Sequence, residues 1–176
     1  PFTDHQTDRS VQLLRLIGLK QTIDNSPISI VSKFSIIDDT TNLGFGIQIM
    51  PNTVVNCYSK IGDYCILNTS STIEHDCVIG NGVHIMSGAT IAGNVKIGNW
   101  VTIGTNATIF PNITVEGGAF IGAGAVVRNN VKQNNIVIGN PAKFLKINEH
   151  IYNLDMFKIA TDWINSKTKF NIPNRK

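Results

Sequence analysis

The chain has 176 residues, of which 42% are hydrophobic, and its formal net charge is +3 at pH 7. This length suffices for one domain with a core, and no apolar run approaches the roughly 18 residues that a membrane-spanning helix needs. The small charge gives no argument for nucleic-acid binding and the three cysteines form no CxxC pair, so we expect a reduced, cytoplasmic protein without nucleic-acid partners or membrane insertion.

Residues 1–27 are expected to form a short helical segment. Residues 8–18 would place Val11, Leu14 and Ile17 on one side of a helix. Because a stack of strands exposes strand edges at both ends, we expect this helix to cover the first end of the structure that follows.

A hexapeptide repeat occupies residues 28–140. Every sixth residue from Val31 to Val127 is aliphatic, and the fourth residue after each, from Ser35 to Val131, is small or β-branched. The small residue and the next aliphatic residue are two positions apart, so both face the same side of a short strand. The pattern therefore predicts a continuous apolar core built from stacked side chains.

Two residues separate successive strands, and these pairs favour tight turns. Asn81-Gly82 and Gly93-Asn94 are examples, and both residue types tolerate left-handed backbone. Each hexapeptide is then one strand and one corner, and three hexapeptides make one triangular coil. Coils stack at roughly 4.8 Å, the spacing of strands in a sheet. The fold class is all-β, a parallel β-helix with short helical segments at each end.

Residues 141–176 are expected to form a C-terminal extension. Ile147, Ile151, Leu154 and Phe157 recur at three- and four-residue spacing, which predicts an amphipathic helix over residues 147–164. We expect it to cap or pack on the β-helix, with a partner site as the alternative.

The triplet Glu74-His75-Asp76 interrupts the repeat with polar residues. His75 and Asp76 form a corner pair, and Gly93 is at the same edge one coil later. A glycine there leaves its N–H accessible beside the imidazole, which places a base near a donor for a developing oxyanion.

Asn68 and His84 point outward from the face opposite this edge. They meet His75 only when a second subunit packs its face against the edge of the first. The positions therefore indicate an active site shared between the subunits of a cyclic oligomer.

Residues 66–98, ILNTSSTIEHDCVIGNGVHIMSGATIAGNVKIG, closely resemble the acetyl-CoA-dependent sugar acetyltransferases of bacterial surface glycan synthesis. That group includes the N-acetyltransferase of the UDP-bacillosamine pathway and the sialic-acid O-acetyltransferases. The later segments IGAGAVV (121–127) and IGNPAKFLK (138–146) are typical of hexapeptide acyltransferases in general. The resemblance implies a left-handed coil and a homotrimer with active sites at the subunit interfaces.

The resemblance also implies roles for individual residues. His75 would be the general base, Asp76 would orient its ring, and Gly93 would offer its N–H to the thioester carbonyl. Asn68 and His84 would line the acetyl-CoA site at the subunit interface. Pantetheine and the phosphates would pass two further segments, whose residues are Gly122, Ala123 and Ala125, and Asn140, Pro141 and Lys143.

The function that follows is acetyl transfer from acetyl-CoA, without a metal, to a sugar or nucleotide sugar. N-acetylation of a UDP-4-amino sugar is the leading hypothesis, and O-acetylation of sialic acid or another glycan sugar is the alternative. Family members carry an N-terminal α/β domain, whereas the segment 1–27 alone precedes this repeat. Either the chain is a fragment or the acceptor is held differently.

Two other functions are compatible with the same β-helix fold. Carbonic anhydrases of the β-helix type bind zinc with three histidines, but this repeat contains only His75 and His84. A non-catalytic scaffold or an ice-binding surface is the other rival. Ice binding would require a regular threonine ladder, and the outward positions here are mixed.

Overall fold

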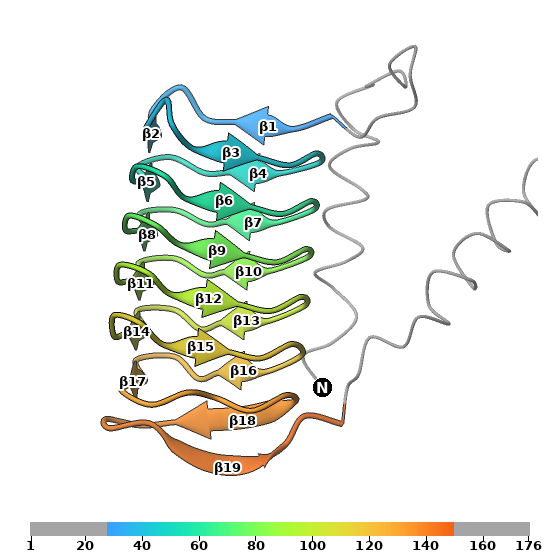
Figure 1. Cartoon of the computed structure of the whole chain (residues 1–176), viewed down its shortest axis with the longest axis vertical. Helices are drawn as coiled ribbons and strands as arrows, with labels where there is room; N and C mark the ends of the chain where they lie inside the picture. The colour runs from blue at the N-terminus through green and yellow to red at the C-terminus, as the bar shows by residue number, and fades with distance from the viewer. Residues whose placement is uncertain (1–27, 150–176) are drawn as a thin grey trace, which may run out of the picture.

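The computed structural model describes residues 28–149 of the chain, which wind into a stack of triangular coils (Figure 1). Three sheets form the faces of this prism. Strands of successive coils pair in parallel within each sheet, and β19 adds one antiparallel strand to sheet A. Sheet A comprises β1 (Ile30–Val31), β4 (Gln48–Ile49), β7 (Ile66–Leu67), β10 (His84–Ile85), β13 (Thr102–Ile103), β16 (Phe120–Ile121), β18 (Asn135–Ile138) and β19 (Lys143–Ile147). Sheet B comprises β2 (Ile36–Ile37), β5 (Val54–Val55), β8 (Thr72–Ile73), β11 (Thr90–Ile91), β14 (Thr108–Ile109) and β17 (Val126–Val127). Sheet C comprises β3 (Asn42–Leu43), β6 (Lys60–Ile61), β9 (Val78–Ile79), β12 (Lys96–Ile97) and β15 (Thr114–Val115).

The coil of three hexapeptides predicted from the repeat is confirmed by the strand register. His84 of β10 pairs with Thr102 of β13, and Lys60 of β6 pairs with Val78 of β9. The chain visits sheets A, B and C in turn, so three edges separate them. We call the corner between sheets B and C edge 1, that between C and A edge 2, and that between A and B edge 3.

Alternation of side chains builds the core as the pattern predicted. In the unit around β9, Cys77 and Ile79 are buried, whereas the intervening Val78 is 44% exposed. The small inward positions also bond to the backbone: Ser59 Oγ donates to Glu74 O at 2.8 Å, and Cys65 Sγ to Gly80 O at 3.1 Å. These bonds satisfy polar groups that would otherwise be costly inside an apolar core.

Most corners place their second residue in left-handed backbone. Asn94, Asn112 and Asp76 adopt φ of 57°, 62° and 59°. Asparagine and aspartate tolerate this region better than most side chains, and this explains why such residues recur at the corners.

The two ends of the prism depart from the ideal repeat. Val31 and Leu43 belong to the aliphatic columns but are exposed, because no earlier coil among the described residues covers them. At the other end, Phe120 pairs with Ile136, whereas an ideal repeat would pair it with Ile138. The last coil is therefore shorter than the others by two positions.

One sequence prediction is wrong in this last coil. The repeat places Val131 at a small position, but it forms a parallel bridge with Val115, which is an aliphatic position. The shortened coil moves Val131 forward by two positions, and it remains buried. The chain then returns as β19, which pairs antiparallel with β18 and extends sheet A beyond residue 140.

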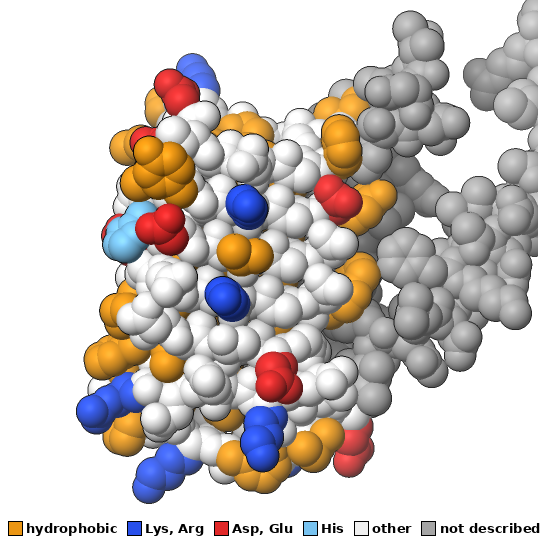
Figure 2. Space-filling view, in the orientation of Figure 1, with side chains coloured by type: hydrophobic (Ala, Val, Ile, Leu, Met, Phe, Trp, Pro, Cys, Tyr) orange, Lys and Arg blue, Asp and Glu red, His pale blue; other side chains and the backbone are white. Residues whose placement is uncertain are grey.

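The helices expected in residues 8–18 and 147–164 lie outside the described residues, except that Ile147 ends β19. Within residues 28–149 there is no helix long and apolar enough to cross a membrane. On the face seen in Figure 2, basic side chains are isolated over the middle of the prism and more frequent at its lower end, and acidic side chains lie beside the histidine at the left edge.

Candidate active site

His75 and Asp76 form a corner of edge 1, as predicted, and their side chains bond to each other. His75 Nδ1 lies 2.8 Å from Asp76 Oδ2, and the two side chains are 57% and 55% exposed. The backbone N–H of Asp76 donates to Cys57 O at 3.0 Å, which fixes the corner on the coil before it. Because a carboxylate only accepts, Nδ1 carries the proton, and the lone pair of the neutral ring is at Nε2.

Gly93 lies directly beneath this ring, one coil further along edge 1. The N–H of Asn94 donates to His75 O at 2.9 Å, and a Cβ built on Gly93 would lie only 2.6 Å from His75 Nε2. Any side chain here would displace the imidazole. Among the described residues, the N–H of Gly93 has no hydrogen-bond acceptor. The imidazole of His75 and a free N–H donor thus occupy adjacent coils.

Glu74 completes the polar triplet, and the sequence analysis assigned it no role. Its Oε2 accepts a hydrogen bond of 2.7 Å from Asn56 Nδ2, which comes from the preceding coil. The signal available in the sequence was the spacing of three hexapeptides between Asn56 and Glu74, which places them one above the other on sheet B beside edge 1.

His84 and Asn68 lie on sheet A, opposite edge 1, as predicted. His84 Nε2 is buried and has no hydrogen-bond partner among the described residues, and burial lowers the pKa of this histidine. Asn68 follows β7, and its Oδ1 accepts a hydrogen bond of 2.7 Å from the N–H of Thr69. The outward row through His84 is half-buried and contains Ile66, Thr102 and Phe120.

The candidate residues of the segments 121–127 and 138–146 lie around edge 3. Gly122 is buried, and a Cβ there would lie 2.7 Å from Ile138 Cγ2, so the coil beneath requires glycine. The neighbouring Ala123 is exposed. Ala125 is fully buried in the core, so its side chain cannot reach a ligand.

In the next coil, Asn140, Pro141 and Lys143 are exposed where the chain turns into β19. The predicted site residues therefore divide into two groups on one prism. His75, Asp76 and Gly93 lie on edge 1, and the other eight lie on sheet A and around edge 3.

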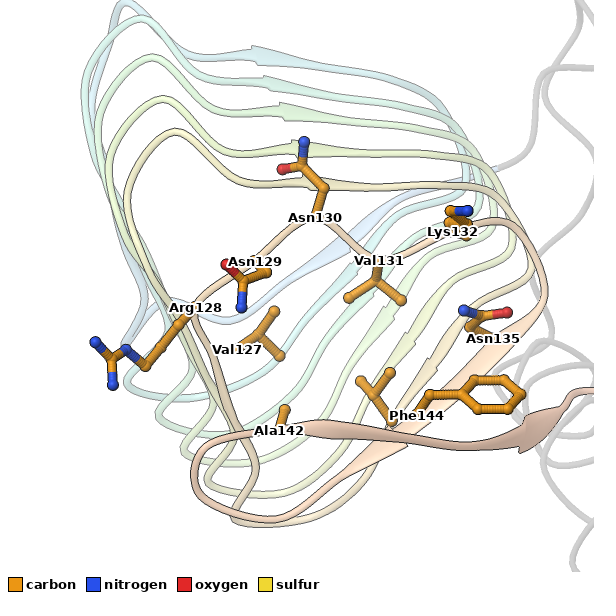
Figure 3. Close-up of a pocket in the computed structure, with 10 residues that line it drawn as sticks. Val127, Arg128, Asn129, Asn130, Val131, Lys132, Asn135, Ala142 and Phe144 are labelled. Atoms are coloured by element: carbon orange, nitrogen blue, oxygen red, sulfur yellow. The ribbon is translucent and has the colours of Figure 1, made fainter.

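Neither of two hollows on the surface contains His75. One, of about 210 Å³, opens at the end of the last coil beside Val127, Val131 and Phe144 (Figure 3). The other, of about 850 Å³, lies over sheet C and edge 2, beside Lys96, Trp100 and Glu116. Edge 1 is a convex corner, and a convex corner cannot enclose a ligand by itself.

No group of three His, Cys, Asp or Glu side chains within residues 28–149 is arranged to hold a metal ion. The zinc alternative would need a third histidine ligand, and His75 and His84 lie on opposite sides of the prism.

Residues 76–111 match the family model for the bacterial transferase hexapeptide, in six repeats. The repeat of this chain is therefore of the hexapeptide type. A comparison with curated protein sequences gave no match.

Solved structures similar to this hexapeptide-repeat protein include bacterial sugar acetyltransferases, which confirms the resemblance expected from the sequence. PerB of Caulobacter crescentus, solved with CoA and GDP-perosamine, is 28% identical, with a TM-score of 0.69 over 77% of this chain and 66% of that one. The acetyltransferase domain of PglB from Neisseria gonorrhoeae is 32% identical, with a TM-score of 0.67 over 78% and 64%. WeeI of Acinetobacter baumannii is 33% identical, with a TM-score of 0.68 over 79% and 65%. The hexapeptide-repeat protein thus spans slightly less than two thirds of the length of these chains.

Proposed function

We propose that this protein is an acetyltransferase that moves an acetyl group from acetyl-CoA to an amine of a nucleotide sugar, most specifically a UDP-4-amino sugar. The observation that carries the proposal is the position of His75 Nε2 over Gly93, with Nδ1 bonded to Asp76. Solved complexes of similar proteins support it, because PerB was solved with CoA and GDP-perosamine.

The reaction needs a base and an oxyanion donor, and edge 1 supplies both. The amine nitrogen attacks the thioester carbonyl carbon as His75 Nε2 takes a proton from it. The carbonyl oxygen becomes an oxyanion, which the N–H of Gly93 stabilises. When the tetrahedral intermediate collapses, the C–N bond remains, the C–S bond breaks, and the proton on His75 passes to the CoA sulfur.

The donor site is proposed to be completed by a second copy of the chain in a homotrimer. Sheet A of one copy would face edge 1 of its neighbour, so Asn68 and His84 would line the thioester beside His75. Two observations support this arrangement: the convex edge and the unpartnered Nε2 of His84. Around edge 3, exposed Ala123, Asn140, Pro141 and Lys143 would follow pantetheine and its phosphates.

The test is acetyl transfer from labelled acetyl-CoA to a panel of UDP-4-amino sugars and sialic acids, followed by mass spectrometry. We expect an N-acetylated nucleotide sugar and one equivalent of free CoA per product. His75→Ala should keep the fold and lose at least about a hundredfold in rate. If His75→Ala retains the wild-type rate, or if no sugar of the panel is acetylated, the proposal fails.

A further inference from the structure

The carboxylate of Glu74 has no cationic partner in the described structure, although it is half-buried beside the proposed base. Its one side-chain bond is the 2.7 Å contact with Asn56 Nδ2. The single ion pair found within residues 28–149 joins His75 and Asp76. A half-buried carboxylate with one amide donor still has accepting capacity, and a cation would stabilise it.

The fold does not require an acid at this position. The corresponding residues of the three following coils are Ala92, Phe110 and Arg128, because each of them directly follows a strand of sheet B. A small, an aromatic and a cationic side chain are therefore accepted where Glu74 stands. This argues that the Asn56–Glu74 pair serves a purpose other than holding two coils together.

The geometry of the reaction places the acceptor on the same side as Glu74. The oxyanion donor, Gly93, lies one coil beyond His75, so the thioester carbonyl must lie toward the later coils. The attacking atom must reach His75 Nε2, and the rest of the acceptor then extends toward the earlier coil. That coil presents Asn56 and the exposed ring of Tyr58, and no lysine or arginine of the described residues pairs with Glu74.

We propose that Glu74, held by Asn56, determines specificity by accepting a hydrogen bond from the acceptor's amine, and so selects amines over hydroxyls. This deepens the proposed function and rests on it. A hydroxyl has one hydrogen, and His75 must take it. An amine has a further N–H that can donate to Glu74. In its protonated form the amine also supplies the positively charged partner that the Glu74 carboxylate does not have among the described residues. A hydroxyl acceptor would leave the Glu74 carboxylate without this donor, which disfavours it.

The experiment compares the wild-type chain with Glu74→Gln, which keeps the size of the side chain and an oxygen for Asn56. The probes are a UDP-4-amino sugar and UDP-N-acetylglucosamine, which has a hydroxyl at the same carbon. For the amine, kcat/KM should fall about tenfold through a higher KM, while the KM for acetyl-CoA and the melting temperature stay unchanged. Turnover of the hydroxyl probe should not fall.

Asp39→Asn is the matched control, because it removes one negative charge from an exposed position on the same edge, two coils earlier. It should leave both KM values unchanged. The proposal is overturned if Glu74→Gln lowers kcat/KM equally for both probes, or if it raises the KM for acetyl-CoA. It is also overturned if Asp39→Asn raises the KM for the amine as much as Glu74→Gln does.

Binding without acetyl-CoA separates this inference from the proposed function. Calorimetry of the UDP-4-amino sugar should show weaker binding to Glu74→Gln than to wild type, by about tenfold. If the wild type transfers no acetyl group, the proposed function fails, and this binding comparison still decides the role of Glu74. Equal binding to both chains would overturn it.

Discussion

His75 can act as a base only in the tautomer that leaves Nε2 unprotonated, and Asp76 selects this tautomer. Asp76 reaches Nδ1 because its own backbone adopts φ of 59° at the corner, which turns its side chain back onto the neighbouring ring. The turn residue and the orienting residue are therefore the same residue. This double role limits the substitutions that the position accepts, because most side chains disfavour left-handed backbone.

Asp76→Asn separates these two roles. Asparagine tolerates the same backbone, so the fold and the melting temperature should be preserved. The amide can donate as well as accept, so it no longer fixes the tautomer, and kcat should fall about 10- to 100-fold. Steady-state kinetics at saturating acetyl-CoA provide the measurement. A wild-type kcat would show that Asp76 does not orient the ring.

His84 should make stability depend on pH. Burial lowers its pKa below the ordinary value of 6.5 in the folded state, so below pH 6.5 the unfolded chain binds a proton that the folded chain does not. The free energy of unfolding should therefore decline as the pH falls through 6.5 and be unaffected by this residue above it.

His84→Gln provides the comparison for this prediction. Melting temperatures at pH 7.5 and pH 5.5 should differ more for the wild type than for the variant, because other titrating groups are common to both chains. Equal differences would mean that His84 is protonated as readily in the folded chain as in the unfolded one.

The relation of residues along an edge could be predicted from the sequence, but their side-chain bonds could not. The period of three hexapeptides placed Gly93 beneath His75, since backbone stacking alone determines it. The spacing also places Asn56 beside Glu74, but the bond between their side chains and the unpartnered Nε2 of His84 depend on side-chain orientation and on what covers each atom. No spacing in the sequence encodes these two properties.

At the scale of elements, the strands of this protein are too short to be stable alone. All but β18 and β19 contain two residues, so each depends on the coil before it, the coil after it and the side chains within. Ile91 of β11 is fully buried and is stacked between Ile73 and Ile109. The free energy of unfolding lost when Ile91 is truncated should show how much one core side chain stabilises the prism.

Ile91→Ala should lower the free energy of unfolding by about 2–5 kcal/mol, because it leaves a cavity in a column that cannot collapse. Thr90→Ala, on the outer side of the same strand, should change it by less than about 0.5 kcal/mol. Denaturant unfolding followed by circular dichroism measures both. If the two variants lose equal stability, the assignment of inward and outward positions is wrong.

The last coil shows where element prediction from a repeat fails. Val131 follows Val127 by four positions, as a small residue of the repeat should, so the local pattern is intact. Shortening a coil by two positions preserves the alternation of side chains and changes only the partner in the neighbouring coil, Val115. Pairing between coils is a tertiary property, and therefore the shortened coil could not be detected from the hexapeptide pattern.

At the scale of the whole molecule, the two groups of candidate residues face away from each other. Edge 1 carries the proposed base, and sheet A with edge 3 carries the residues proposed to bind acetyl-CoA. A closed ring of identical subunits solves this separation, because each copy can offer its edge to one neighbour and its face to the other. Every active site would then take its base from one chain and its donor site from another.

Mixing two inactive chains tests this central claim most directly. One chain carries His75→Ala, and the other carries Asn68→Ala with His84→Ala. Each alone should be nearly inactive in acetyl transfer to a UDP-4-amino sugar. When the two are unfolded and refolded together at equal amounts, an interface has an intact edge and an intact face with probability ½ × ½, so about a quarter of the wild-type activity should return. If the mixture is no more active than the sum of the separate chains, the shared active site, and with it this account of catalysis, is contradicted.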